Sequence, residues 1–369
     1  MSVLNAYSKK KDTVNAVNEI KENFKDGENK LILFFASSNY PKNKVAEEMK
    51  NAFPDSKIFG CTTAGEITSG QLLKSSLVAM SFDSEEIEDV EIAVIENISN
   101  EDNVASALIG LEKYYGKRLK EMDYEKYVGV ILFDGLSNSE EKIMEKIGDH
   151  TDLTVIGGSA GDDVKFEETF VFADGKTYNN AAVLALIKTK RGFDTIKTQS
   201  FDVLDKEFTV TKVDESNRRK VLEINNEPAV EYYAKLVGTD KEDAQNHFMD
   251  NPTGLMVNGE PYVRSPQRIE GNAICFYCQV KEGTSLKLLK ATDIISETKT
   301  AITRKLTEIG SISALINFHC ILRTLQLEDE GKEDEYGEIF KDIPTIGFST
   351  YGEEYIGHIN QSSTMLVFK

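Results

Sequence analysis

Three short stretches of the chain combine glycine, hydroxyl residues and a closing acidic residue. They are residues 60–66 (GCTTAGE), 157–162 (GGSAGD) and 347–353 (GFSTYGE), and each follows a short apolar run. Glycine permits positive φ angles and a close approach of a ligand to the backbone, and hydroxyl groups both donate and accept hydrogen bonds. At the carboxyl ends of strands, where ligands of such sheets sit, these stretches could bind a small polar ligand.

The three stretches contain most of the candidate ligand-binding residues. The backbone N–H groups and hydroxyls are the expected hydrogen-bonding groups, and the closing carboxylate is the expected partner of a ligand ammonium group. These candidates are Gly60, Cys61, Thr62, Thr63, Gly65, Glu66, Gly157, Ser159, Gly161, Asp162, Gly347, Ser349, Gly352 and Glu353. The pattern also fits a structural turn, in which the carboxylate forms an ion pair with an arginine or accepts hydrogen bonds from backbone N–H groups. Internal duplication of the chain would preserve such a turn as readily as a binding site.

Two arginines stand where they could hold a ligand carboxylate. Arg323 comes shortly after the apolar run 313–318, in the same copy of the pattern as the third stretch, and Arg264 lies in the segment YVRSP. A guanidinium group binds a carboxylate through two parallel hydrogen bonds, although either arginine could instead form a structural ion pair. The remaining candidates in this part of the chain are Cys320, His358 and Asn360.

Two motifs with chemical associations are predicted to be structural. Residues 157–161 match the G-x-S-x-G of a hydrolase nucleophile elbow, but no helical pattern follows them, as that motif requires. Cys275 and Cys278 form a C-x-x-C motif in a strand-like apolar run, where their side chains point to opposite faces, and zinc would need two more ligands. We therefore predict no catalytic residue, no metal site and no cofactor.

The composition narrows the classes of partner. Of the 369 residues, 40% are hydrophobic and 28% charged, which suffices for the cores of two domains. The net charge of −19 argues against nucleic acid, because the phosphate backbone would be repelled. No apolar run approaches the ~20 residues that span a bilayer, the N-terminus lacks a signal-peptide layout, and the four cysteines do not resemble a secreted disulfide framework. We expect a soluble, cytoplasmic protein without a membrane span.

The elements around the three stretches repeat, and they predict an α/β (mixed α+β) fold. Each copy reads strand, loop, helix or charged connector, strand, glycine-rich stretch and strand. The opening strands are expected at 31–36, 127–133 and 313–318, where continuous apolar runs are typical of strands covered on both faces. The strand before the first stretch is expected to end at Phe59. We expect two domains with mixed β-sheets flanked by helices.

The copies are unevenly spaced. Their first glycines stand 97 residues apart (60 to 157) and then 190 apart (157 to 347). One explanation is a degenerate or replaced unit between the second and third copies. We divide the chain into a lead-in with a helix at 1–29, a first domain at 30–195 and a second domain at 196–369.

Residues 191–300 follow a different pattern. Alternating apolar residues at 208–213 and 220–224 predict antiparallel strands. Pro228 and Gly238 bracket a predicted helix, because proline is favoured in the first turn and glycine just after the last.

These features together resemble the FIST family. The stretch GCTTAGEI at 60–67 resembles the signature of the FIST N domain. The third stretch, followed by His358 and Asn360, resembles the end of the FIST C domain, as do Cys320 and Arg323 after their strand. The resemblance extends over nearly everything from about residue 30 to the last residue.

The resemblance implies a bacterial, intracellular sensory module that binds a small ligand, with amino acids as one class. FIST modules often accompany signalling output domains. FIST-like sequence fills this chain, so the resemblance implies a signalling partner protein supplied in trans, with no nucleic acid involved.

The leading hypothesis is therefore a sensor of a small zwitterion or anion. Arg264 or Arg323 would bind a carboxylate, Glu66 or Glu353 would bind an ammonium group, and closure of the stretches would shift an equilibrium that the partner detects.

Two alternatives remain. In one, the protein is an enzyme with Cys61 or Cys320 as nucleophile and His319 or His358 as base. In the other, it is a scaffold that binds a protein and no small molecule.

Overall fold

The computed structural model describes residues 2–25, 27–355 and 357–369. The chain forms two compact units. The larger unit comprises Met1–Thr198, Thr298–His358 and Ser363–Lys369, and the smaller unit comprises Gln199–Glu297 and Ile359–Ser362. The predicted class, mixed α/β with two domains, is confirmed. The region predicted as the second domain, 196–369, contributes to both units.

Three six-stranded sheets make up the described part of the larger unit, and all have the same strand arrangement. In order, the first sheet contains β1 (Val3–Ser8), β6 (Leu77–Phe82), β2 (Leu31–Ser37), β3 (Lys57–Thr63), β10 (Val171–Ala173) and β11 (Lys176–Tyr178). The second contains β7 (Ile87–Glu96), β12 (Ala181–Thr189), β8 (Tyr127–Phe133), β9 (Val155–Ser159), β24 (Glu353–Tyr355) and β25 (His358–Ile359). The third contains β13 (Phe193–Gln199), β26 (Ser362–Phe368), β22 (Ala314–Cys320), β23 (Thr345–Thr350), β4 (Glu66–Thr68) and β5 (Gln71–Leu73).

Each sheet is built from one copy of the repeat plus a hairpin from another copy. The hairpin β4–β5 follows β3 of the first sheet and joins the third sheet beside β23. Likewise β10–β11 follows β9 and joins the first sheet beside β3, and β24 follows β23 and joins the second beside β9. The repeated unit predicted from the sequence is thus present three times, and its copies exchange hairpins in a cycle.

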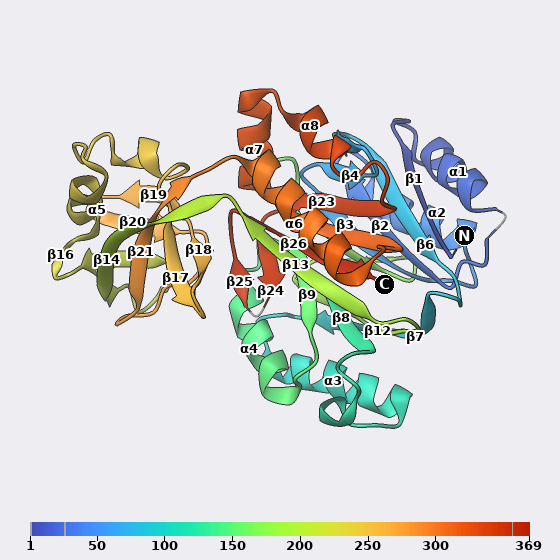
Figure 1. Ribbon diagram of the computed structural model, residues 1–369. Helices are drawn as coiled ribbons and strands as arrows, with labels where there is room; N and C mark the ends of the chain where they lie inside the picture. Colours follow the sequence, from blue (N-terminus) through green and yellow to red (C-terminus); the bar gives the residue numbers. More distant parts are fainter. Residues whose placement is uncertain (1, 26, 356) are drawn as a thin grey trace. The chain divides into compact units, whose positions relative to one another are not determined.

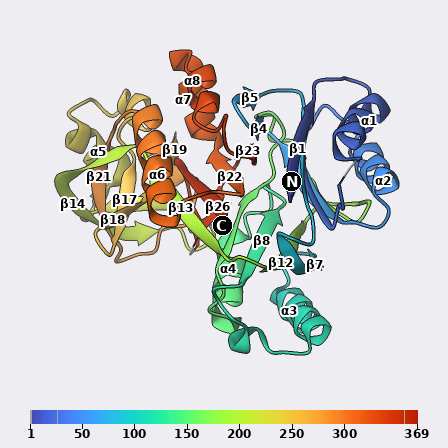
Figure 2. The ribbon, with the colours of Figure 1, turned by 45° about the vertical axis from the view of Figure 1, so that its right-hand side comes forward.

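Helices cover the outer face of each sheet (Figure 1). The first sheet carries α1 (Thr13–Phe24) and α2 (Lys42–Ala52), which lie together on one side of β1 (Figure 2). The second carries α3 (Glu101–Tyr115) and α4 (Glu140–His150), with the short turn η1 (Leu119–Glu121). The third carries α6 (Ile294–Ile309), α7 (Ile321–Glu330) and α8 (Glu333–Glu338).

The inner faces of the three sheets share one hydrophobic core. Phe35 of the first sheet lies 4.5 Å from Phe348 of the third, measured between ring centroids, and Leu132 of the second belongs to the same core. All seven residues of β2 are buried, because Leu33 and Phe35 face this core while Phe34 faces α1 and α2. The continuous apolar run of this strand is therefore explained as predicted, because the strand is covered on both faces.

The glycine-rich stretches are more regular than predicted. The expectation that the strand ends at Phe59 is wrong, since β3 continues to Thr63. Its backbone pairs with β2 on one side and β10 on the other, with Cys61 opposite Phe35 and Val171. Paired backbone on both edges satisfies the N–H and C=O groups, so small polar residues can continue a buried strand.

The first glycine of each stretch is required by the approach of the neighbouring parallel strand. A Cβ atom on Gly60 would lie 1.9 Å from the carbonyl oxygen of Phe34. The equivalent distances are 1.8 Å from Gly157 to the Ile131 oxygen and 2.3 Å from Gly347 to the Asn317 oxygen. No side chain fits at these distances, so these glycines have a packing role in all three copies.

The smaller unit is an insertion within the third copy, between β13 and α6. Its eight-stranded sheet includes β14 (Phe201–Val213), β15 (Lys220–Ile224), β16 (Glu227–Pro228), β17 (Thr253–Val257), β18 (Glu260–Arg264), β19 (Pro266–Glu270), β20 (Ala273–Phe276) and β21 (Ser285–Ala291). This insertion, and no additional repeat, explains the doubled interval before the third stretch.

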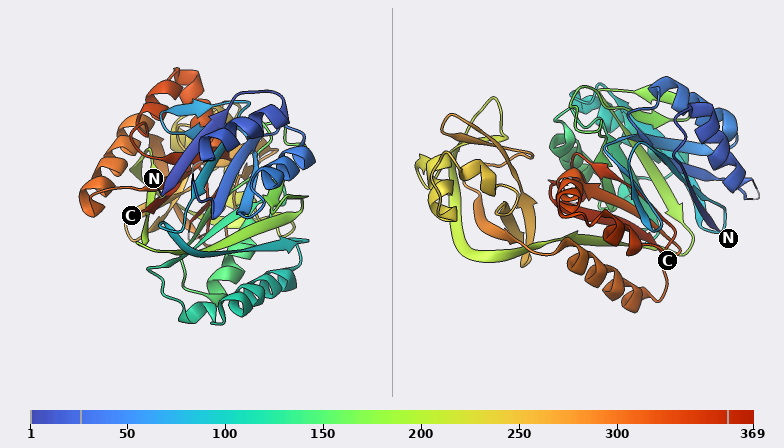
Figure 3. Two further views of the ribbon diagram at one scale, coloured as in Figure 1. Left: turned by 90° about the vertical axis from the view of Figure 1, so that its right-hand side faces the viewer. Right: turned by 90° about the horizontal axis from the view of Figure 1, so that it is seen from above.

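Two predictions for the smaller unit are confirmed. The strands β14 and β15 are antiparallel, with Val210 opposite Ile224. The predicted helix is α5 (Ala229–Val237), which starts after Pro228 and ends at Gly238 in the left-handed conformation. It packs through Val230 and Tyr233 on the core of this unit (yellow in Figure 3), and the turn η2 (Ala244–His247) follows it.

We predict that Gly60→Ala destabilises the protein strongly. The added methyl group would overlap the Phe34 carbonyl, and the paired strands cannot separate without losing hydrogen bonds, so we expect a loss of roughly 3 kcal/mol. Urea unfolding measures this loss.

Gly110→Ala is the control for this measurement. Gly110 lies within α3, and apart from its chain neighbours and the backbone of its own helix no atom of the described residues comes within 4 Å of the position that a Cβ atom would take. The substitution should be neutral or stabilising by up to about 1 kcal/mol. Equal effects of the two substitutions would contradict the packing role.

Candidate functional site

The three glycine-rich stretches meet inside the larger unit. The first and third bond to each other through Ser349, whose N–H donates to the Gly65 oxygen at 2.8 Å and whose carbonyl accepts from Ala64 at 3.3 Å. The second and third bond through Ser159, whose N–H donates to the Gly352 oxygen at 2.9 Å and whose carbonyl accepts from Tyr351 at 3.1 Å. These backbone groups are therefore used within the protein.

The first and second stretches complete the ring. The N–H of Gly161 donates to the Thr62 oxygen at 3.0 Å. A Cβ atom on Gly161 would lie 2.8 Å from the backbone nitrogen of Ala64, and one on Gly65 would lie 3.0 Å from the Ser349 hydroxyl oxygen. Each stretch thus contacts the other two, and at Gly161 the backbone of Ala64 comes so close that only glycine fits.

The closing acid of the first stretch is enclosed by its own neighbours. Glu66 is fully buried and accepts hydrogen bonds from the Thr63 hydroxyl at 2.5 Å and from the N–H and hydroxyl of Ser76 at 3.0 and 2.6 Å. Burial raises the pKa of Glu66 to about 7, although these hydrogen bonds work to lower it. The carboxyl is therefore held partly protonated near neutral pH.

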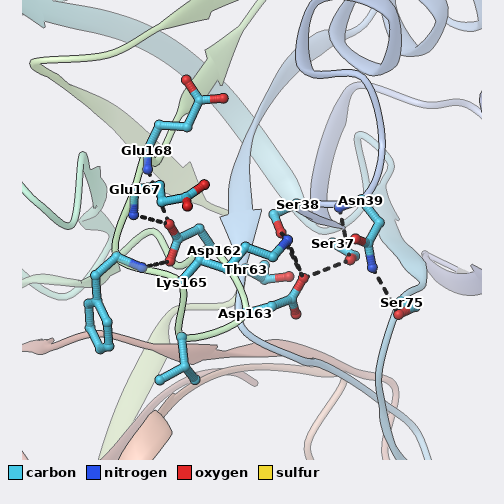
Figure 4. Close-up of polar contacts among 12 residues, drawn as sticks. Ser37, Ser38, Asn39, Thr63, Ser75, Asp162, Asp163, Lys165, Glu167 and Glu168 are labelled. Atoms are coloured by element: carbon cyan, nitrogen blue, oxygen red, sulfur yellow. Dashed lines mark hydrogen bonds and ion pairs between the residues drawn. The ribbon is translucent and has the colours of Figure 1, made fainter.

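The closing acid of the second stretch organises a loop. Asp162 accepts from the backbone N–H groups of Phe166, Glu167 and Glu168 at 2.9, 2.7 and 3.1 Å, and Figure 4 shows the bonds from Glu167 and Glu168. It also accepts from the Tyr351 hydroxyl. Burial works to raise the pKa of Asp162, but these hydrogen bonds outweigh it and hold the pKa below its ordinary value. An ionised carboxylate is thus the anchor of residues 162–168.

The closing acid of the third stretch lies near Arg323. Both Glu353 and Arg323 are buried. Burial lowers the pKa of the Arg323 guanidinium, and the charge of Glu353 opposes that shift. The guanidinium also donates to the Thr298 hydroxyl at 3.0 Å. Arg323 and Glu353 therefore lie near each other. Thr324, the neighbour of Arg323, contacts the third stretch, since its hydroxyl oxygen lies 2.7 Å from that of Ser349.

The other predicted site residues lie in different surroundings. Arg264 and Asn360 belong to the smaller unit, where Arg264 is half-buried and donates to the Val263 carbonyl at 3.1 Å. His358 is buried in the larger unit, with its Nδ1 2.7 Å from a carboxylate oxygen of Glu354.

The four cysteines, all among the described residues, are buried and form no disulfide bond. Burial raises the pKa of the Cys61 thiol well above its ordinary value, which is opposite to the depressed pKa of an activated thiolate.

A cleft of about 560 Å³ opens beside this ring of stretches, between the end of β2, the start of α2 and the loop anchored by Asp162. We call it the β2–α2 cleft. Its lining residues are Ser38, Asn39, Tyr40, Pro41, Lys42, Asn43, Lys44, Thr62, Asp162, Lys165, Glu167, Glu168 and Phe170. The volume is typical of a small-molecule site, and the position at the carboxyl ends of parallel strands is the one expected for ligands of such sheets.

Opposite charges face each other across this cleft. Lys42 of α2 is 2.7 Å from Glu168, measured from Nζ to Oε2, and its ammonium lies 3.8 Å from the centre of the Phe170 ring. Lys165 donates to the Ser38 hydroxyl at 3.1 Å, and the same hydroxyl donates to Asp163 at 2.7 Å (Figure 4). The cleft therefore offers both cations and carboxylates at hydrogen-bonding distance from one another.

Comparison with protein-family models identifies the chain. The FIST N domain matches residues 30–227, and the FIST C domain matches residues 229–355. The chain belongs to the FIST family. The resemblance inferred from residues 60–67 is thereby confirmed, and FIST domains are associated with sensory signal transduction.

Two further similarities were found. This FIST protein is 24% identical over 314 residues to the uncharacterised protein MJ1623 of Methanocaldococcus jannaschii. The match includes 79% of this chain and 59% of MJ1623, so the chain spans less than two thirds of the length of that relative. Among solved structures, PurL of T. maritima complexed with ATP aligns with 99% of this chain and 70% of its own, at 9% identity and a TM-score of 0.20. A score this low does not indicate a shared fold. Among the described residues, no helix has the length and apolar character to cross a membrane.

Sequence reasoning found only part of the β2–α2 cleft of this FIST protein. Thr62 and Asp162 were candidates because they stand in the glycine-rich stretches. Lys42, Lys165 and Glu168 were missed, because their approach depends on a hairpin of the second copy joining the first sheet. The one feature of the sequence that could have indicated this cleft is the run of polar residues that follows the apolar strand β2.

We predict that Glu66→Gln removes a pH dependence of stability. The folded protein keeps the Glu66 proton up to a pKa of about 7, whereas the unfolded chain releases it near 4.5. The contribution of this proton is therefore full below pH 4.5 and is lost as the pH rises through 7, by on the order of 3 kcal/mol. Urea unfolding of wild type and variant across this range should show wild type losing stability relative to the variant.

The exposed Glu22, replaced by Gln, serves as the control for this pH series. Any change with pH that this variant shares with Glu66→Gln does not arise from the burial of Glu66. A constant difference between Glu66→Gln and wild type would show that the pKa of Glu66 is not raised.

We predict that Tyr351→Phe loosens residues 162–168 locally. The hydroxyl of Tyr351 accepts from the N–H of Val164 at 2.8 Å and donates to Asp162, whereas the ring stacks on Phe166 and would remain. Loss of a hydrogen bond to a charged group costs roughly 1.5–3 kcal/mol. Amide hydrogen exchange should therefore accelerate in this segment, and Tyr124→Phe, at an exposed position, should leave it unchanged. Unchanged exchange in Tyr351→Phe would contradict the anchoring role.

Proposed function

We propose that this FIST protein is a sensor that binds a small zwitterion or anion, with amino acids as the leading class, in the β2–α2 cleft. The observation that supports this most directly is the pairing of cations with carboxylates in a cleft of about 560 Å³ at the ends of parallel strands. A zwitterion carries one positive and one negative charge. Its carboxylate can therefore pair with a lysine of the cleft while its ammonium group pairs with a carboxylate of the cleft.

The cationic side of the cleft suits a ligand carboxylate. The first turn of α2 follows Pro41, which provides no side-chain cap, and the N–H groups of a first helical turn have no partner within the helix. The positive end of the helix dipole favours an anion there. Lys42 and Lys165 add two ammonium groups.

The acidic side suits a ligand ammonium group. Glu168 pairs with Lys42, and Asp163 lies 3.9 Å from the Lys165 ammonium. A ligand carboxylate that drew the lysines toward it would release these carboxylates for the ligand ammonium. Because the existing pairs are partly exposed, each contributes little stability, and exchanging them costs little.

The loop that forms one wall is suited to move. Three residues in it other than glycine have positive φ angles, Asp163 at 57°, Val164 at 63° and Phe166 at 56°, and each such residue stores roughly 1–2 kcal/mol of strain. Tyr351 ties this loop to the third stretch. Ligand binding at Lys165 would shift the loop between two positions, and a partner protein in trans would detect the change.

The remaining residues predicted from the sequence have a supporting part in this proposal. Thr62 and Asp162 line the cleft. The others in the ring of stretches would hold the wall and floor in place, since their backbone groups bond to one another.

A thermal-shift screen of amino acids and small organic acids tests the proposal. A ligand at ~100 times its Kd should stabilise the protein by about 2.7 kcal/mol. Lys165→Ala should weaken the response at least about tenfold in apparent Kd, because it removes one charged hydrogen bond. Lys21→Ala, exposed on α1 and outside the cleft, should respond as wild type does. The proposal fails if no compound stabilises the protein, or if Lys165→Ala binds as tightly as wild type.

A further inference from the structure

The third copy of the repeat differs from the other two beneath its helices. In the first copy, Phe34 and Ala36 of β2 face α1 and α2 within an apolar layer, and in the second copy Ile131 and Phe133 do the same under α3 and α4. The matching positions of β22, by its pairing with β23, are Asn317 and His319. Both are fully buried. Two apolar positions of the repeat have thus become polar in one copy.

A directed chain of hydrogen bonds surrounds this pair. The Ser363 hydroxyl donates to the Asn317 oxygen at 2.7 Å, and the Asn317 amide donates to the Tyr336 hydroxyl oxygen at 3.0 Å. The charge of Arg323 also acts on the Tyr336 hydroxyl. Because the Tyr336 oxygen accepts from Asn317, its own proton is available for Nδ1 of His319, 2.9 Å away.

This chain determines the state of His319. Burial and the charge of Arg323 lower the pKa of His319 well below its ordinary value, so the imidazole is neutral. Since Nδ1 accepts the Tyr336 proton, the single imidazole proton lies on Nε2. Within residues 2–25, 27–355 and 357–369, this N–H group has no hydrogen-bond partner although it is buried.

A buried donor without an acceptor is costly, and its surroundings show which acceptor fits. The positive charge of Arg323 acts on His319, so an oxygen that carries negative charge is favoured over a neutral carbonyl. Ser349 stands beside His319 on the neighbouring parallel strand, and its hydroxyl oxygen lies 2.7 Å from that of Thr324. The position is again the carboxyl end of a parallel strand pair.

We infer that this FIST protein has a second binding site, in which His319 Nε2–H, aided by Arg323 and the hydroxyls of Ser349 and Thr324, holds an oxygen of a small oxyanion, either a carboxylate or a phosphate. The site lies in the third copy and is independent of the β2–α2 cleft. Because its residues are buried, the anion enters through local opening of the helices that cover β22.

Imidazole nitrogen–proton correlation spectra of the full chain test this inference. The chain has four histidines, and the His319 signals are identified by their absence in His319→Phe. Sodium formate, acetate and inorganic phosphate are titrated separately, against sodium chloride at matched ionic strength. One of the oxyanions should shift the His319 Nε2–H signal until it saturates, and chloride should not; formate or acetate would indicate a carboxylate site and phosphate a phosphate site.

Three variants separate this site from a structural role of His319. His319→Phe, which copies the residue of the second repeat, should abolish saturable anion binding, and His319→Gln, which keeps an N–H donor, should bind roughly tenfold more weakly than wild type. Lys165→Ala should leave the His319 response unchanged, so failure of the cleft proposal would not affect this one. The inference is overturned if the wild-type Nε2–H responds to none of the three oxyanions. The His319 signals are also absent in His319→Gln, so this variant supplies the assignment for the wild-type measurement if His319→Phe does not fold.

Discussion

The larger unit depends on close backbone contact at the three glycine-rich stretches. At Gly60, Gly157 and Gly347 a neighbouring carbonyl oxygen occupies the place of a side chain, at 1.8 to 2.3 Å from the Cβ position. A few residues later the stretches bond to one another in a ring. These contacts bring three sheets around one core and allow each copy to place its hairpin on the sheet of the copy before it, with the first copy joining the third sheet. The glycines are therefore structural first, and the two proposed sites lie around them.

A threefold scaffold need not carry three equal sites. In the first copy the strand end is polar and opens into the β2–α2 cleft, where lysines and carboxylates meet. In the third copy the strand end is closed by helices, and the polar groups form a buried layer around His319 and Arg323. The three repeated sheets form a rigid framework, and the side chains that differ between the copies determine which polar groups lie at each strand end. This division suits a sensor, because a rigid framework lets a small change at one wall reach a distant surface.

Much of the fold could be predicted because its signals are local. Apolar runs identified the central strands, Pro228 and Gly238 bracketed a helix, and the recurrence of glycine, hydroxyl and acid exposed the repeat. The cleft could not be assembled in the same way. Lys165 and Ser38 are 127 positions apart and meet only because β10 pairs with β3. The doubled spacing before the third stretch suggested a degenerate or replaced unit, whereas the structure shows the smaller unit inserted there.

The repeat, the family and the chemical types available at each strand end could all be inferred from the amino-acid sequence. They follow from patterns within a few residues, which constrain local backbone and burial. How those groups are used depends on the tertiary structure. It turned the amides of the stretches toward one another, enclosed Glu66 with Thr63 and Ser76, and left the Nε2–H of His319 without an acceptor among the described residues. Hydrogen bonding between segments far apart in the chain depends on strand order and register, and neither is encoded in any single stretch.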